Sequence, residues 1–242
     1  MDPLTNSSVI GRLLEEISWE GQNVRAYRDG GRGRENVLTA EVLWPLSCLP
    51  RDALLAEVLR HAHGAEANRL RAAAEAEEAD VMLLPDEIKL GPERVVVQPD
   101  ASIISPSTFV LVEAKRIRPS SFQAHQLPRE LVALVSQAGA RSPLLLVLKE
   151  PLPVPVAGLG RLSLHDALTL DLPAVLAKTP EVNATMHDLV ERLPDIVAWI
   201  TWAEIAELTR RQRGLFHDAR YGLRGTVQRL TDEVTRAIEW HG

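Results

Sequence analysis

This sequence has a single cysteine, no long hydrophobic run and no excess of positive charge, and each of these features excludes a class of protein. Cys48 is the single cysteine among 242 residues, so the chain cannot form an internal disulfide, and we expect a reduced, cytoplasmic protein. No apolar run is long enough to cross a bilayer, and Met1-Asp2-Pro3 does not resemble the start of a signal peptide. We therefore expect no membrane partner.

The charge balance excludes a uniformly basic nucleic-acid-binding protein, because the net charge is −6 at pH 7. A local basic patch can still bind phosphate groups. Two arginine clusters are candidates: Arg25, Arg28, Arg32 and Arg34 around a glycine-rich turn, and Arg116, Arg118 and Arg129 further along the chain. A solvated face is the simpler interpretation of either cluster taken alone. The histidines show no metal-ligand spacing, and neither a glycine-rich phosphate loop nor a zinc motif is present.

The order of the predicted elements indicates an α/β or α+β fold, in which helices flank a central mixed sheet. The pattern predicts an amphipathic helix from Glu35 to near Pro50 and further helix over residues 51–80. The remaining predictions are a meander of strands at 81–84, 88–90, 95–104 and 108–115, a helix at 120–140, strands at 144–148 and 197–201, a short strand and helix within 162–178, and helices at 203–212 and 225–240.

This order predicts one main domain with two attachments. Residues 1–34 are expected to form a helix and a glycine-rich turn, residues 35–215 the domain itself, and residues 216–242 a C-terminal helix packed on that domain. A length of 242 residues suits such an arrangement. The C-terminal helix also offers an apolar face, on which a second copy of the chain or a partner subunit is expected to dock.

One apolar run departs from the usual end of a buried strand, because it leads directly into Glu113-Ala114-Lys115. Side chains alternate across a sheet, so Glu113 and Lys115 project from one face and Ala114 from the other, where its small size permits close packing. Asp100 lies on the preceding strand and approaches Glu113 if the two strands pair across the turn at 105–107. Two facing carboxylates repel each other unless a cation lies between them.

These ligands suit a hard ion such as Mg²⁺, for which Mn²⁺ is expected to substitute. Asp100, Glu113 and the backbone carbonyl of Ala114 would supply the oxygen ligands. The metal would lower the pKa of a bound water and offset charge on a phosphoryl oxygen, while Lys115 would orient that water or stabilise the transition state. The arrangement predicts phosphodiester hydrolysis. Taken singly, a turn role for Asp100 or an exposed Glu113–Lys115 charge pair is the simpler explanation.

The whole motif resembles that of the PD-(D/E)XK nuclease superfamily, also called restriction-endonuclease-like. The matching residues are Pro99-Asp100, then twelve others, then Glu113-Ala114-Lys115. The resemblance implies a restriction-endonuclease-like core and a metal-dependent nuclease. In that family the two acids hold the metal and the lysine positions the nucleophile. The same Glu-x-Lys spacing at Glu87-Ile88-Lys89 lacks a preceding Pro-Asp across a strand turn, so we interpret it as a chance match.

Three further features of the resemblance supply supporting residues. The family usually places a glutamate on a helix before the sheet, and Glu35 or Glu41 would fill this position. They are six residues apart and cannot face the same way, so at most one reaches the metal, and we favour Glu35. Many members carry a glutamine on the helix after the lysine strand, which Gln126 matches. Trp199 and Trp202 lie in a segment that is similar to a late segment of these proteins, and we expect both in the core.

The expected substrate is DNA, although nothing in the residues distinguishes it from RNA. Phosphates flanking the scissile bond would be contacted by basic residues near the motif: Arg116, Arg118 and Arg129. The alternative function is a non-catalytic nuclease-like binding or assembly module in a nucleic-acid-processing or defence complex. The net negative charge and the C-terminal helix motivate this alternative.

Overall fold

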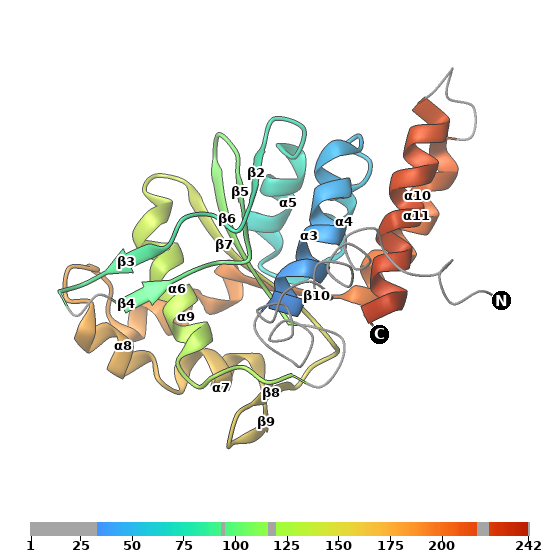
Figure 1. Ribbon diagram of the computed structural model, residues 1–242. Helices are drawn as coiled ribbons and strands as arrows, with labels where there is room; N and C mark the ends of the chain where they lie inside the picture. The colour runs from blue at the N-terminus through green and yellow to red at the C-terminus, as the bar shows by residue number, and fades with distance from the viewer. Residues whose placement is uncertain (1–32, 93–94, 116–119, 217–222, 242) are drawn as a thin grey trace, which may run out of the picture.

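The computed structural model describes residues 33–92, 95–115, 120–216 and 223–241, and at its centre is a six-stranded mixed sheet (Figure 1). The strands, from one edge of the sheet to the other, are β1 (His63–Gly64), β10 (Val197–Thr201), β7 (Ser142–Lys149), β6 (Thr108–Ala114), β5 (Ala101–Ile104) and β2 (Asp80–Leu83). Strand β7 is parallel to β6 and β10, and the other neighbouring pairs are antiparallel. The predicted N-terminal helix and most of the glycine-rich turn lie outside the described residues.

Helices cover both faces of this sheet, as Figure 1 shows. The helices on one face are α3 (Gly33–Cys48), α4 (Leu55–His61), α5 (Glu66–Ala74), α10 (Trp202–Arg213) and α11 (Leu223–His241). Those on the other face are α6 (Gln126–Ala138), α7 (Leu164–Thr169), α8 (Leu172–Lys178) and α9 (Met186–Ile196). A short 3-10 turn at Gly214–Phe216 follows α10. The predicted fold class, a mixed α/β arrangement with helices on a central sheet, is confirmed.

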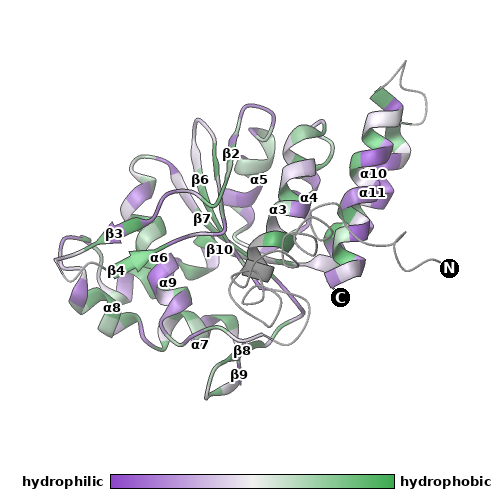
Figure 2. Ribbon diagram, viewed as in Figure 1, coloured by the Kyte–Doolittle hydropathy of each residue, from purple (hydrophilic) through white to green (hydrophobic). Residues whose placement is uncertain are grey.

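Strand β6 lies at the middle of this three-layer arrangement and is buried along its whole length. Val110, Val112 and Ala114 belong to the hydrophobic cluster on the α3 side, whereas Phe109 and Leu111 belong to the cluster on the α6 side. Because both faces are covered, the strand consists almost entirely of hydrophobic residues, which Figure 2 shows as apolar colour in the central strands. Ala114 is fully buried, as expected of a small residue beneath a helix layer.

Two short hairpins lie outside the main sheet. Strand β3 (Ile88–Leu90) pairs with β4 (Val95–Val97), and β8 (Val154–Val156) pairs with β9 (Gly160–Leu162). The prediction of one strand over 95–104 is therefore wrong, because that segment divides between β4 and β5, which belong to different sheets. The division includes Pro99, which has no N–H to donate to a strand ladder. It leaves Asp100 immediately before β5.

The predicted helix over residues 51–80 is also wrong. Helix α4 ends at His61, the edge strand β1 follows, and α5 begins at Glu66. Gly64 makes this change of direction possible: its φ is +79°, and a Cβ there would lie 2.6 Å from the carbonyl oxygen of Val197. The helix expected over 120–140 is shorter than predicted, because α6 begins at Gln126. Helix α9 was not predicted.

The C-terminal helix α11 packs against α3 and α10. Its apolar side chains, including Val227, Val234 and Ile238, are buried there, and His241 Nε2 lies 3.0 Å from Glu41 Oε2 on α3. The apolar face that the sequence offered to a partner is thus covered by the chain itself. None of the described helices has the length and apolar character needed to span a membrane.

Helix α10 begins with a capping box at its junction with β10, and this contact can be tested by mutation. Thr201 Oγ1 accepts a hydrogen bond from the N–H of Glu204, and Glu204 Oε2 accepts one from the N–H of Thr201. We expect Thr201→Ala to lower the free energy of unfolding by about 1 kcal/mol, measured by urea denaturation. Ser136→Ala, on the exposed side of α6, is the control and should change it by less than about 0.5 kcal/mol. Equal effects would contradict the role of the cap.

Candidate functional site

Asp100 is held against the end of β6 by its own hydrogen bonds. Its N–H donates to the carbonyl oxygen of Val112 at 3.1 Å, and Val112 is also the residue that pairs with Ala101 at the end of the β5–β6 ladder. Its Oδ2 accepts a hydrogen bond from the N–H of Ala114 at 2.7 Å. The structure therefore brings the two predicted acids to neighbouring positions at the ends of two adjacent strands.

Glu113 projects between the sheet and α6, where two donors meet one of its oxygens. Glu113 Oε1 accepts a hydrogen bond from Lys115 Nζ at 3.1 Å and another from Gln126 Nε2 at 2.5 Å. Glu113 and Lys115 are only 2% and 7% exposed, so they form a buried ion pair and not the exposed charge pair of the simpler explanation. Gln126 begins α6, and its amide joins the start of that helix to the sheet.

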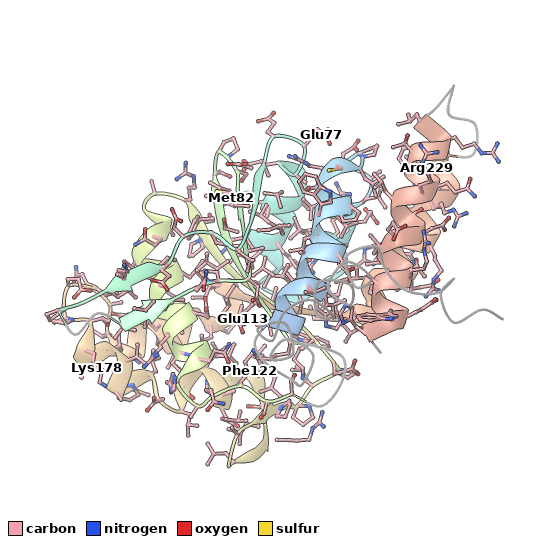
Figure 3. The ribbon with its side chains drawn as sticks, viewed as in Figure 1. Glu77, Met82, Glu113, Phe122, Lys178 and Arg229 are labelled. Atoms are coloured by element: carbon pink, nitrogen blue, oxygen red, sulfur yellow. The ribbon has the colours of Figure 1, made fainter. Side chains whose placement is uncertain are left out.

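Lys115 is fixed in position by groups from three other segments. Its N–H donates to Leu148 O on β7 at 2.7 Å, and its carbonyl oxygen accepts a hydrogen bond from Trp202 Nε1 at 2.7 Å. The Lys115 ammonium lies 5.0 Å from the centre of the Phe122 ring, within the range of a cation–π interaction. Figure 3 labels Glu113 and Phe122 at this end of the sheet, well away from Met82. Trp202 is thus a core residue, as predicted, and it also holds the lysine backbone.

Glu130 is an acidic residue of this site that the sequence reasoning missed. It lies on α6 one turn after Gln126 and is buried at 3% exposure, and its Oε2 has no hydrogen-bond partner within the described part of the chain. Burial raises the pKa of Glu130 well above its ordinary value, the charges of Glu113 and Asp100 raise it further, and Lys115 opposes them. The available signal was an acid four residues after Gln126 on the apolar side of an amphipathic helix.

Lys149 is a second buried cation at the same end of the sheet, and it was also missed. The parallel register of β6 and β7 sets Lys149 beside Lys115. Its ammonium donates to the carbonyl oxygens of Pro151 and Pro153 at 3.2 and 3.4 Å. Burial lowers the pKa of Lys149 to about 8, and the nearby charge of Arg161 acts in the same direction. Lys149 therefore holds the loop after β7.

The structure does not place the other predicted site residues beside Asp100 and Glu113. Glu41 lies on the opposite layer and is engaged by His241, while the side chain of Glu35 lies outside the described part of the chain. Arg116 and Arg118 are also outside it. Arg129 is half-buried, and its Nε has no hydrogen-bond partner among the described residues. Burial lowers the pKa of His125, and the charge of Arg129 lowers it further, so Arg129 acts on His125 on the α6 side.

The site brings together oxygen ligands of the kind that a hard divalent cation prefers. Asp100, Glu113 and Glu130 offer carboxylate oxygens, and the buried Oε2 of Glu130 lacks a donor. Among the described residues, no three His, Cys, Asp or Glu side chains are already grouped as a metal-ligand set. Cation binding therefore requires side-chain rearrangement, most directly the release of Glu113 Oε1 from Lys115 or Gln126.

Comparisons of the chain with protein-family models, with curated proteins and with solved structures found no match. The site must be interpreted from its own geometry.

The raised pKa of Glu130 predicts a pH dependence of stability in metal-free protein. The folded state binds this proton more tightly than the unfolded state, so the wild type loses stability as pH rises from the ordinary value of 4.5 through the raised pKa. Glu130→Gln removes that loss. We expect urea denaturation in EDTA to show the variant more stable than the wild type at pH 7, with the difference shrinking as pH falls toward 4.5. A constant difference across that range would be inconsistent with a buried, uncompensated carboxylate.

The hydrogen bond from Trp202 to Lys115 makes a second prediction. Trp202→Phe leaves the buried carbonyl of Lys115 without its donor and removes part of a fully buried ring, so we expect the free energy of unfolding to fall by about 2 to 3 kcal/mol. Trp199→Phe is the control, because Trp199 is only partly buried and stacks on His63. The measurement is chemical denaturation of both variants, and an equal loss in the two would show that the indole N–H has no special role.

Proposed function

We propose that this protein is a Mg²⁺-dependent nuclease with a restriction-endonuclease-like core. One observation carries the proposal: Asp100, Glu113 and Lys115 meet at the ends of β5 and β6, with Gln126 on Glu113. A chance occurrence of the motif letters gives no reason for four such groups to converge. The arrangement of the main-sheet elements agrees with this core, since a helix precedes three antiparallel strands, and a crossover helix leads to a strand parallel to the third.

Each of these side chains has a role that follows from its position. Asp100 and Glu113 would hold the cation, and the backbone hydrogen bond of Asp100 keeps its carboxylate in place. When bound, Mg²⁺ supplies charge neutralisation and a more acidic water. Lys115 places a positive charge beside Glu113, where it stabilises negative charge developing on a phosphoryl oxygen and orients the attacking water. Gln126 orients Glu113 through its amide.

The proposed substrate is DNA, with RNA as the alternative. Both carry the phosphodiester that this site would cleave, and the net charge of −6 restricts binding to a local basic surface. Arg116 and Arg118, which directly follow the lysine in the chain, are the residues proposed to contact flanking phosphates. Comparing cleavage of duplex DNA, single-stranded DNA and single-stranded RNA of one sequence decides between the two.

A non-catalytic module is the second candidate, favoured by a specific observation. Glu113 Oε1 is already engaged by Lys115 and Gln126, and no ligand set is assembled within the described residues. In such a module these contacts would be structural, joining α6 to the sheet. Cation binding without cleavage of any nucleic-acid substrate would favour this second candidate.

The nuclease proposal is tested by a cleavage assay with matched variants. Plasmid, single-stranded DNA and single-stranded RNA are incubated with the protein and Mg²⁺ or Mn²⁺, and EDTA is added in parallel. We expect metal-dependent cutting that falls at least about 100-fold in Asp100→Ala and in Lys115→Ala, because each removes a group at the reacting phosphate.

The chain provides its own control for this assay. Glu87, just before β3, and Lys89, on β3, repeat the Glu-x-Lys spacing but are exposed, with Lys89 Nζ and Glu87 Oε2 3.8 Å apart. The double variant Glu87→Gln with Lys89→Ala should cut as the wild type does. Circular dichroism and thermal unfolding confirm that each variant is folded. Cutting that survives both Asp100→Ala and Lys115→Ala would contradict the proposal.

A further inference from the structure

Glu130 has a buried carboxylate oxygen for which the described residues provide no hydrogen-bond donor. Its carboxyl group is buried between α6 and the sheet, and Oε2 has no hydrogen-bond partner within the described part of the chain. Leaving a buried carboxyl without a donor costs several kcal/mol in general, so such groups are nearly always paired or bound to a metal. Glu130 lies in the middle of α6, where no loop can move it into solvent.

The surroundings of Glu130 are acidic. The charges of Glu113 and Asp100 raise the pKa of Glu130, and the charge of Lys115 opposes them. The Lys115 ammonium is itself hydrogen-bonded to Glu113 Oε1. Arg129, the next cation along α6, acts on His125 instead. The described charges leave an excess of negative charge at this place.

A second orphaned oxygen lies on the sheet face that Glu130 faces. Ser102 is opposite Leu111 in the β5–β6 ladder, so its side chain points to the same side of the sheet as Leu111 and Glu113. Ser102 Oγ is buried at 2% exposure and also has no hydrogen-bond partner among the described residues. The sheet and α6 thus each carry a buried oxygen without a partner on the sides that face one another.

The position of Glu130 along α6 brings it to the same site as Gln126. The two are four residues apart and so lie on one face of the helix, and Gln126 reaches Glu113 at 2.5 Å. One turn further along, Glu130 approaches Glu113 and Asp100 from the helix side. The rival candidate Glu41 lies in the opposite layer, bound to His241.

We propose that Glu130 is a ligand of the divalent cation at this site and binds it jointly with Asp100 and Glu113. The inference rests on the proposed function in that both require a cation at the end of β6. It assigns a third carboxylate to the helix after the lysine strand, whereas the family resemblance implies a glutamate on the helix before the sheet. The cation supplies the positive charge that Glu130 Oε2 lacks, and Gln126 or Lys115 releases Glu113 when it binds.

The test measures cation binding directly, with no dependence on catalysis. Mn²⁺ is titrated into the full-length chain and followed by electron paramagnetic resonance of the free ion, and the shift in unfolding temperature on adding Mg²⁺ is recorded. We expect Glu130→Gln to weaken Mn²⁺ binding by at least about 10- to 100-fold and to abolish most of the Mg²⁺-induced shift. Without metal, the variant should unfold at the same temperature as the wild type or higher, because an unpaired buried carboxyl is gone.

Two further variants serve as controls. Glu87→Gln, exposed just before β3, should bind Mn²⁺ as the wild type does. Glu41→Gln tests a glutamate that is bound to His241 in the opposite layer and should leave the affinity within about twofold. The inference is overturned if Glu130→Gln binds Mn²⁺ with wild-type affinity, or if Glu41→Gln causes the larger loss. A Glu130→Gln protein that unfolds at a much lower temperature without metal would show a structural role and would also overturn it.

The outcomes for this inference and for the nuclease proposal can be told apart. Mn²⁺ binding that depends on Glu130, with no cleavage of any substrate, supports the ligand assignment and contradicts the hydrolytic function. Metal-dependent cleavage by the wild type, with unchanged Mn²⁺ affinity in Glu130→Gln, supports the hydrolytic function and contradicts the ligand assignment. A wild-type protein that binds neither Mn²⁺ nor Mg²⁺ contradicts both.

Discussion

The pairing of β5 with β6 is the constraint on which the site depends. It holds the Asp100 backbone against β6, where the Asp100 carboxylate accepts the N–H of Ala114 next to Glu113. A slip of one residue in this register would move Asp100 away from the Ala114 N–H and dismantle the site. Burial of β6 on both faces prevents such a slip, because it would also expose Val110 and Val112 to the wrong layer.

The second property of the site is an unbalanced charge in a buried place. Glu113 and Lys115 form an ion pair that Gln126 completes, which is how a buried pair is usually stabilised. Glu130 Oε2, in contrast, has no hydrogen-bond donor among the described residues. Polar groups left unsatisfied in a core are costly, and they concentrate where a ligand is to be bound. The hydrogen bond from Lys115 to Glu113 stabilises the protein without a metal. A cation that binds Glu113 would have to alter this same contact.

The central part of the fold was predictable from the sequence, and the reasons are local. Apolar runs mark β6 and β7, the Thr201 capping box marks the start of α10, and alternation places Glu113 and Lys115 on one face. What failed depended on distant contacts. Nothing local shows that Gly64 packs against Val197, so the break between α4 and α5 was missed. Glu130 looked like an ordinary helix residue, because its burial depends on where α6 lies against the sheet. The pairing of β4 with β3 in a separate sheet also depends on distant packing, so the sequence did not predict it.

The most direct measurement is a crystal structure of the protein soaked with Mn²⁺, with the ion located by its anomalous scattering. The account predicts one strong peak at the end of β6, with carboxylate oxygens of Asp100 and Glu113 about 2.1 to 2.2 Å away. A Mn²⁺-soaked crystal with no peak there, and with Glu113 still bonded to both Lys115 and Gln126, would contradict it.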